Sequence, residues 1–221
     1  MKQSGVALIA GLALLAAISL LALVSTSGMI LQQQMASNQR ENERALENSA
    51  IASFSATAWL YSRANHEREP DCISDCLLPV GILNPGDLPD QIEYQSAGWW
   101  ALNGIEAGFN PLTGDEPVFA SSSGADAPRW VMEEIHFEVI ENAPVQNPTQ
   151  GVGYYRILGR GTGKHAGKVA LTELIIARPW GGDYQLGAFP PGPDPGDFCS
   201  QFSELPESAL DCGRLAWRQR R

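Results

Sequence analysis

Positive charge is scarce in this sequence of 221 residues, in which 15 Lys and Arg stand against 25 Asp and Glu for a net charge of -10. Direct binding of nucleic acid needs a basic surface, so we expect none here. Histidine is also scarce, and none of the three (His66, His136 and His165) stands in an H-x-x-x-H or H-E-x-x-H pattern. We therefore expect a non-catalytic protein with no cofactor and no bound metal.

Charge is missing altogether between Lys2 and Arg40. Residues 6–24 read VALIAGLALLAAISLLALV, with one hydroxyl at Ser19 and no polar stripe. As a helix this run would be about 29 Å long, close to the hydrocarbon thickness of a bilayer. The sequence predicts a membrane-spanning segment, and we assign residues 6–28 to it.

The helical pattern continues beyond the apolar run. Residues 29–64 contain no Pro and no Gly, and they are rich in Ala, Gln, Glu, Arg and Leu. Apolar residues recur there at a spacing compatible with one helix face. We predict one helix from about Val6 to about Ala64, with a transmembrane half and an amphipathic half over residues 29–66.

Three interpretations of the N-terminus compete. A cleaved secretory signal would use a small-x-small site, of which Ala22-Leu23-Val24 is a weak version. A generic signal anchor would leave the apolar run attached. A type IV prepilin would carry a very short polar leader ending in Gly, as residues 1–5 do.

The segment from Gly5 to Ala50 resembles the N-terminal region of PilX-type minor pilins of type IV pili. That family shows a Gly-(Val/Ala)-Ala-Leu start, an apolar run, and then a Leu-Gln-x-x-Met-Ala-x-Asn-x-Arg segment. The matching residues in this sequence are Leu31, Gln32, Met35, Ala36, Asn38 and Arg40. Residues 128–134 and 155–163 resemble the family's C-terminal blocks more loosely.

The resemblance implies how the N-terminus is processed. Prepilin peptidase would cut after Gly5, and the new N-terminal amine of Val6 would be methylated. Major pilins carry Glu at the fifth mature position, where it pairs with a neighbour's N-terminal amine, whereas this sequence has Ala10 there. An unpaired amine is expensive in hydrocarbon, so a subunit without the acid suits the tip of a fibre.

The resemblance also implies a place and a role. The protein would be a fimbrial minor pilin that takes part in pilus assembly, in a tip or priming complex that supports twitching motility. It would sit single-pass in the bacterial inner membrane, with its C-terminal domain periplasmic, and then in the pilus. Its partners would be other minor pilins, the major pilin, a PilY-type tip adhesin and prepilin peptidase. The alternatives are a minor pseudopilin of a type II secretion system and another membrane-anchored periplasmic binding protein.

The remaining residues, 67–221, are expected to form a globular domain rich in Pro and Gly. Alternation predicts strands over 129–141, 153–162 and 168–178, with Ile135, Phe137 and Val139 on one face of the first. Gly161 to Gly167 reads as a Gly-rich hairpin turn. Short strands are expected at 91–94 and 98–102, and an irregular tail from Gly181. The expected fold is α+β and pilin-like, with a small antiparallel sheet covered by residues 45–60 of the helix.

The four cysteines, Cys72, Cys76, Cys199 and Cys212, allow three disulfide connectivities, and the sequence does not choose among them. Proximity favours Cys72 with Cys76, and the pilin resemblance implies a C-terminal loop bounded by a disulfide between Cys199 and Cys212. A zinc site at Cys72-x-x-x-Cys76 lacks a second pair of ligands.

One Gly-rich segment, Gly159-Arg-Gly-Thr-Gly-Lys164, suggests a phosphate-binding loop. It fails the spacing, because Leu158 stands where that motif needs Gly, and His165 where it needs Ser or Thr. The acidic pairs Asp115–Glu116 and Asp194/Asp197 lack the spacing of an EF-hand and read as solvated turns.

Overall fold

The structure is a computed structural model that describes residues 4–69, 76–111, 113–114, 127–139, 149–164, 167–181, 198–199 and 211–220. Its elements are α1 (Ser4–Tyr61), β1 (Ile82–Leu83), the 3₁₀ helix η1 (Ile92–Tyr94), α2 (Ala97–Asn103), β2 (Ile105–Glu106), β3 (Arg129–Val139), β4 (Thr149–Thr162), β5 (Val169–Gly181) and β6 (Gly213–Arg220). The chain forms two compact units, one ending at Glu41 and one starting at Asn42.

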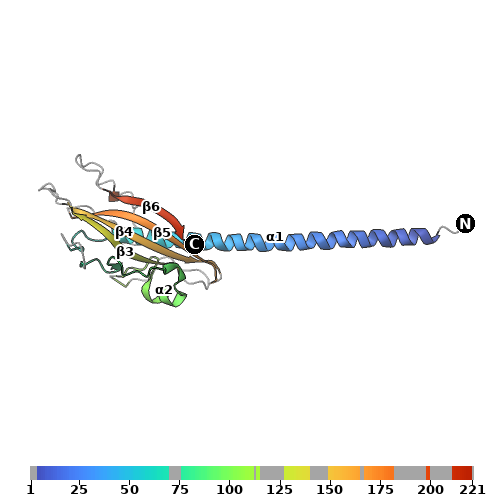
Figure 1. The fold of residues 1–221 in the computed structure, drawn as a ribbon, viewed down its shortest axis with the longest axis horizontal. Helices are drawn as coiled ribbons and strands as arrows, with labels where there is room; N and C mark the ends of the chain where they lie inside the picture. Colours follow the sequence, from blue (N-terminus) through green and yellow to red (C-terminus); the bar gives the residue numbers. More distant parts are fainter. Residues whose placement is uncertain are drawn as a thin grey trace. The chain divides into compact units, whose positions relative to one another are not determined.

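The long N-terminal helix predicted from the sequence is confirmed. α1 has 58 residues and continues through the boundary between the units (Figure 1). It ends three residues before the predicted Ala64, because the backbone of the next residues forms hydrogen bonds with side chains. The carbonyl of Arg63 accepts a hydrogen bond from the Arg178 guanidinium, and the amide of Ala64 donates to the Glu67 carboxylate over 2.9 Å.

The sheet is mixed, and the predicted antiparallel sheet is wrong in that respect. Its strand order is β1-β3-β4-β5-β6, with β2 also paired to β3. The three long strands and β6 are antiparallel to their neighbours, whereas β1 runs parallel to β3. β1 and β2 have two residues each and lie in segments expected to be loop, since a strand this short leaves no alternating pattern.

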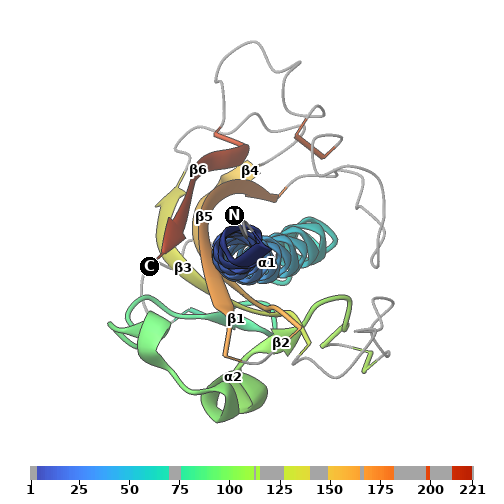
Figure 2. The same ribbon diagram turned by 90° about the vertical axis from the view of Figure 1, so that its right-hand side faces the viewer.

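The C-terminal third of α1 covers one face of this sheet, as residues 45–60 were predicted to do. Figure 2 shows the strands curving around the helix. The core between them combines small helix residues with large aromatic residues of helix and sheet; it includes Ala52, Ala56, Trp59, Leu60, Trp130, Met132, Tyr155, Ile157, Leu174, Ile176 and Trp180. This layer holds helix and sheet of the second unit together.

The opposite face carries a second, smaller core formed by Leu88, Ile92, Trp100, Val131, Leu158 and Leu171. The strands predicted at 91–94 and 98–102 are wrong, because these residues form η1 and α2. The Ser96 hydroxyl accepts a hydrogen bond from the Trp99 amide over 3.1 Å and caps α2. An N-cap at Ser96 followed by Ala therefore outweighs the strand preference of the tryptophans.

The long strands lie near their predicted positions but differ in detail. A bulge between Glu134 and His136 in β3 buries Glu134 and exposes Ile135, so the predicted alternation is wrong there. β4 begins at Thr149, before the predicted 153, and β5 ends at Gly181, after the predicted 178. The tail expected to be irregular contains β6, which is exposed along most of its length and so lacks an apolar alternation.

Candidate functional site

The residues predicted for processing and assembly all lie in α1, within the unit that ends at Glu41. Gly5 and Val6 stand in its first turn, and Ala10 is exposed. Large apolar side chains are exposed along this segment, with Leu15 65% accessible as an example. Within the described part of the chain, no helix combines the length and the apolarity that a membrane span requires.

The second unit holds its part of α1 through two glycines of β4. An added Cβ at Gly159 or Gly161 would overlap backbone atoms of Ala45, Asn48 or Ser49. Glycine therefore lets the helix and strand backbones approach closely at this point. The segment that suggests a phosphate loop is thus a helix-docking site.

Hydrogen bonds fix the register of this docking. The Asn48 amide donates to the carbonyl of Thr162 over 2.6 Å, and the hydroxyls of Ser53 and Thr172 lie 2.9 Å apart. The buried helix positions Ala45, Ser49, Ala52, Ser53 and Ala56 are all small. Small residues on one helix face, opposite Gly-x-Gly on a strand, are a signal that sequence reasoning missed.

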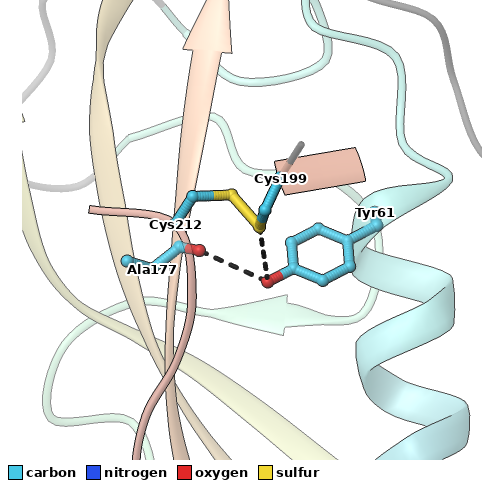
Figure 3. The surroundings of a disulfide bond; sticks show 4 residues. All are labelled: Tyr61, Ala177, Cys199 and Cys212. Atoms are coloured by element: carbon cyan, nitrogen blue, oxygen red, sulfur yellow. Dashed lines mark hydrogen bonds between the residues drawn. A yellow bond between two sulfur atoms is a disulfide. The ribbon is translucent and has the colours of Figure 1, made fainter. Parts of the chain in front are cut away.

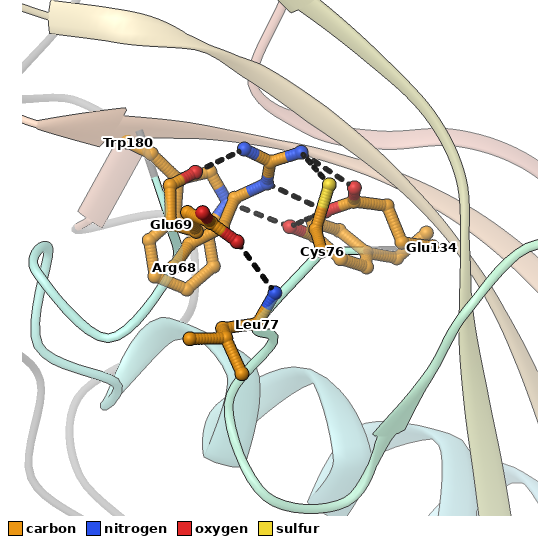
Figure 4. Close-up of polar contacts among 7 residues, drawn as sticks. Arg68, Glu69, Cys76, Leu77, Glu134 and Trp180 are labelled. Atoms are coloured by element: carbon orange, nitrogen blue, oxygen red, sulfur yellow. Dashed lines mark hydrogen bonds and ion pairs between the residues drawn. The ribbon is translucent and has the colours of Figure 1, made fainter. Parts of the chain in front are cut away.

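A buried polar network lies under the end of α1 (Figure 4). Arg68 donates two hydrogen bonds to the Glu134 carboxylate, over 2.9 and 2.7 Å. The Tyr155 hydroxyl donates to the same carboxylate over 2.8 Å and accepts from the Trp180 indole over 2.7 Å. Burial, and then the Glu134 charge, raise the pKa of Tyr155 well above its usual value. The paired charges are satisfied internally, which is typical of a structural core network.

A second buried cation, Arg178, stacks on the Trp180 ring at 3.6 Å from the ring centroid. It donates to the carbonyl of Arg63 and, over 3.3 Å, to the side chain of Asn65. Burial lowers the pKa of Arg178 to about 9. The network therefore locks the chain that follows α1 onto β5.

One disulfide connectivity is resolved, because Cys199 is bonded to Cys212 with 5.5 Å between the Cα atoms (Figure 3). Its sulfur at Cys199 lies 3.8 Å from the Tyr61 hydroxyl, which donates to the carbonyl of Ala177 over 3.4 Å. The disulfide thus joins Cys199 to the residue before β6 and lies against the last residue of α1. Cys76 is also disulfide-bonded, whereas Cys72 lies outside the described residues.

An open groove of about 640 Å³ lies between α1 and β6, beside this disulfide. The helix contributes Phe54, Thr57 and Tyr61 to its wall, and β6 contributes Arg214 and Trp217. Sequence reasoning missed this groove because its walls come from opposite ends of the chain.

The described residues contain no group of three His, Cys, Asp or Glu side chains suited to a metal. His136 is exposed and its ring lies 5.7 Å from that of Tyr154. His165 and the acidic pairs Asp115–Glu116 and Asp194/Asp197 lie outside the described residues.

No family model matches this chain, and neither a curated protein nor a solved structure does.

Proposed function

We propose that this chain is a minor pilin of the type IV pilus, with a structural role in pilus assembly. The observation that carries the proposal is the contrast along α1. One helix of 58 residues combines a charge-free start, whose leucines are exposed, with an end that packs small residues on a sheet. A subunit that moves from a membrane into a helical fibre needs both parts.

The N-terminal part supplies the driving force for assembly in this proposal. Its apolar surface would pack against other pilin helices after leaving lipid, aided by the small residues Ala7, Gly11, Ala13, Ala16 and Ala17. Nothing lies within 4 Å of an added Cβ at Gly11, so a neighbouring helix has room there. The periplasmic sheet and loops would then choose the partners.

The place in the fibre follows from Ala10. Without a carboxylate at this position, the subunit offers no counter-ion to the N-terminal amine of a subunit ahead of it. A place at the tip, within a complex of minor pilins under a PilY-type adhesin, agrees with this absence. The inner membrane would hold the subunit before assembly, and prepilin peptidase would process it after Gly5.

A deletion strain of the source bacterium tests the proposed role. Loss of surface pili is expected, with recovery on return of the wild-type gene. The variant Gly5→Val should fail to restore pili because the residue before the cut is changed, whereas Gly167→Ala, in open space on the second unit, should restore them. Normal, retractable pili in the deletion strain would contradict the role. A defect in type II secretion alone would favour the pseudopilin alternative.

A further inference from the structure

β6 ends the strand order of the sheet, and among the described strands only β5 pairs with it. Its residues from Arg214 to Gln219 are all exposed. An edge strand of this kind presents unpaired backbone N–H and C=O groups, which can template another strand. Among the described residues, the outer edge of β6 therefore has no strand partner and can accept an added strand.

The side of β6 that faces α1 is only half covered. Trp217 and Arg214 pair with Leu174 and Ile176, both core residues under the helix, but both β6 residues are exposed. Trp217 is 52% exposed, and Phe54 on the helix is 47% exposed across the groove from it. An added strand would place every second side chain over this groove.

The charges on β6 indicate which kind of strand could pair with it. β6 carries Arg214, Arg218 and Arg220, whereas the chain as a whole has a net charge of -10. Arg218 and Arg220 pair with Glu173, and Arg220 also with Glu93, on the face away from the groove. Arg214 lines the groove, where no carboxylate of the described residues pairs with it.

This charge pattern argues against a second copy as the occupant. β6 contains three arginines and no acidic residue, so a second β6 strand would bring no counter-charge to Arg214 and would add like charge beside it. A heterologous strand with acidic residues would instead complement Arg214.

We propose that β6 is a docking edge for an extended, acidic segment of a different protein, which pairs with the β6 backbone and seats an apolar side chain between Phe54 and Trp217. This goes beyond the assembly role because it names a surface and the chemistry of its partner. Backbone pairing would supply affinity, and the groove and Arg214 would supply selectivity.

The test uses the full chain in detergent micelles and two labelled peptides, each as long as the eight residues of β6. One alternates glutamate with valine or leucine, and the other has lysine in place of glutamate. Fluorescence anisotropy measures affinity, and amide hydrogen exchange shows where binding protects the backbone. The expected result is saturable binding of the acidic peptide alone, with new protection along β6.

Variants locate the contact. Trp217→Ala and, from the opposite wall, Phe54→Ala should each weaken acidic-peptide binding by about tenfold or more, as for an anchor in an interface. Arg214→Glu should shift the preference toward the lysine peptide. Leu102→Ala, at the 88% exposed Leu102 of α2, is the matched control and should leave binding unchanged.

Equal binding of both peptides, or binding without protection of β6, would overturn the proposal. So would self-association of the chain through β6, detected by crosslinking of Gln219→Cys. The peptide assay does not depend on N-terminal processing, so its failure would leave the pilin proposal standing. If the pilin proposal failed, the result of the peptide assay would still stand.

Discussion

The two parts of α1 differ in how far their apolar side chains are exposed. Up to Glu41, the leucines and isoleucines whose side chains are described are exposed, whereas the part from Ala45 onward buries Ala45, Ser49 and Ala52 together with Trp59 and Leu60. Apolarity alone therefore does not decide which part packs on the sheet, and the buried face differs by including small residues. A helix that must approach a strand closely uses small residues, and bulky residues are free to serve another partner.

The largest effect is expected where helix and strand backbones meet. Gly161→Ala places a Cβ against the backbone of Ala45 and Ser49, which cannot move without shifting the helix. We expect a loss of about 3 kcal/mol in the free energy of unfolding, measured with urea. Gly167→Ala, with no atom within 4 Å of the new Cβ, should change it little. Equal effects of the two variants would contradict the close docking.

The comparison between the two parts of the helix is tested directly by exchanging sizes. Ala52→Leu overfills the core under the helix and should cost about 2 kcal/mol. Leu15→Ala, in the exposed part, should change the unfolding of the second unit by less than about 0.5 kcal/mol. A larger effect of Leu15→Ala than of Ala52→Leu would reverse the roles assigned to the two parts.

The polar network under the helix gives a smaller effect. Tyr155→Phe leaves the Trp180 indole without its acceptor and removes one donor from Glu134, at a cost of about 1 to 2 kcal/mol. The neighbouring Tyr154 is more exposed, with its hydroxyl 3.0 Å from Asp211, so Tyr154→Phe should cost less. Matching melting temperatures for the two variants would show that the network contributes nothing.

The smallest effect is a change with pH. The buried Tyr155 keeps its proton in the native state above its usual pKa of 10.0, whereas the unfolded chain loses it. Its contribution to stability is therefore complete below pH 10 and falls as the pH rises further. The stability difference between wild type and Tyr155→Phe should fall by about 1.4 kcal/mol per pH unit above 10. Arg178 is common to both proteins, so its titration largely cancels. A constant difference from pH 9 to 11 would contradict the burial of this phenol.

The sequence carried enough information for the helix and the three long strands, because each has a long regular pattern. β6 was missed since it is exposed on both sides, and the bulge after Glu134 was missed since one extra residue reverses the alternation. The C-terminal disulfide loop implied by the pilin resemblance is confirmed by the Cys199–Cys212 bond, whereas the groove between Phe54 and Trp217 needed tertiary structure. The roles of Gly5, Val6 and Ala10 depend on partners and an enzyme, so they stay predictions.

The most direct test of the account is the mass of the mature chain after co-expression with prepilin peptidase. The account predicts loss of Met1 to Gly5 and gain of one methyl group on Val6, both abolished in Gly5→Val. An intact Met1 in the presence of active peptidase, or a new N-terminus close to Val24, would contradict it.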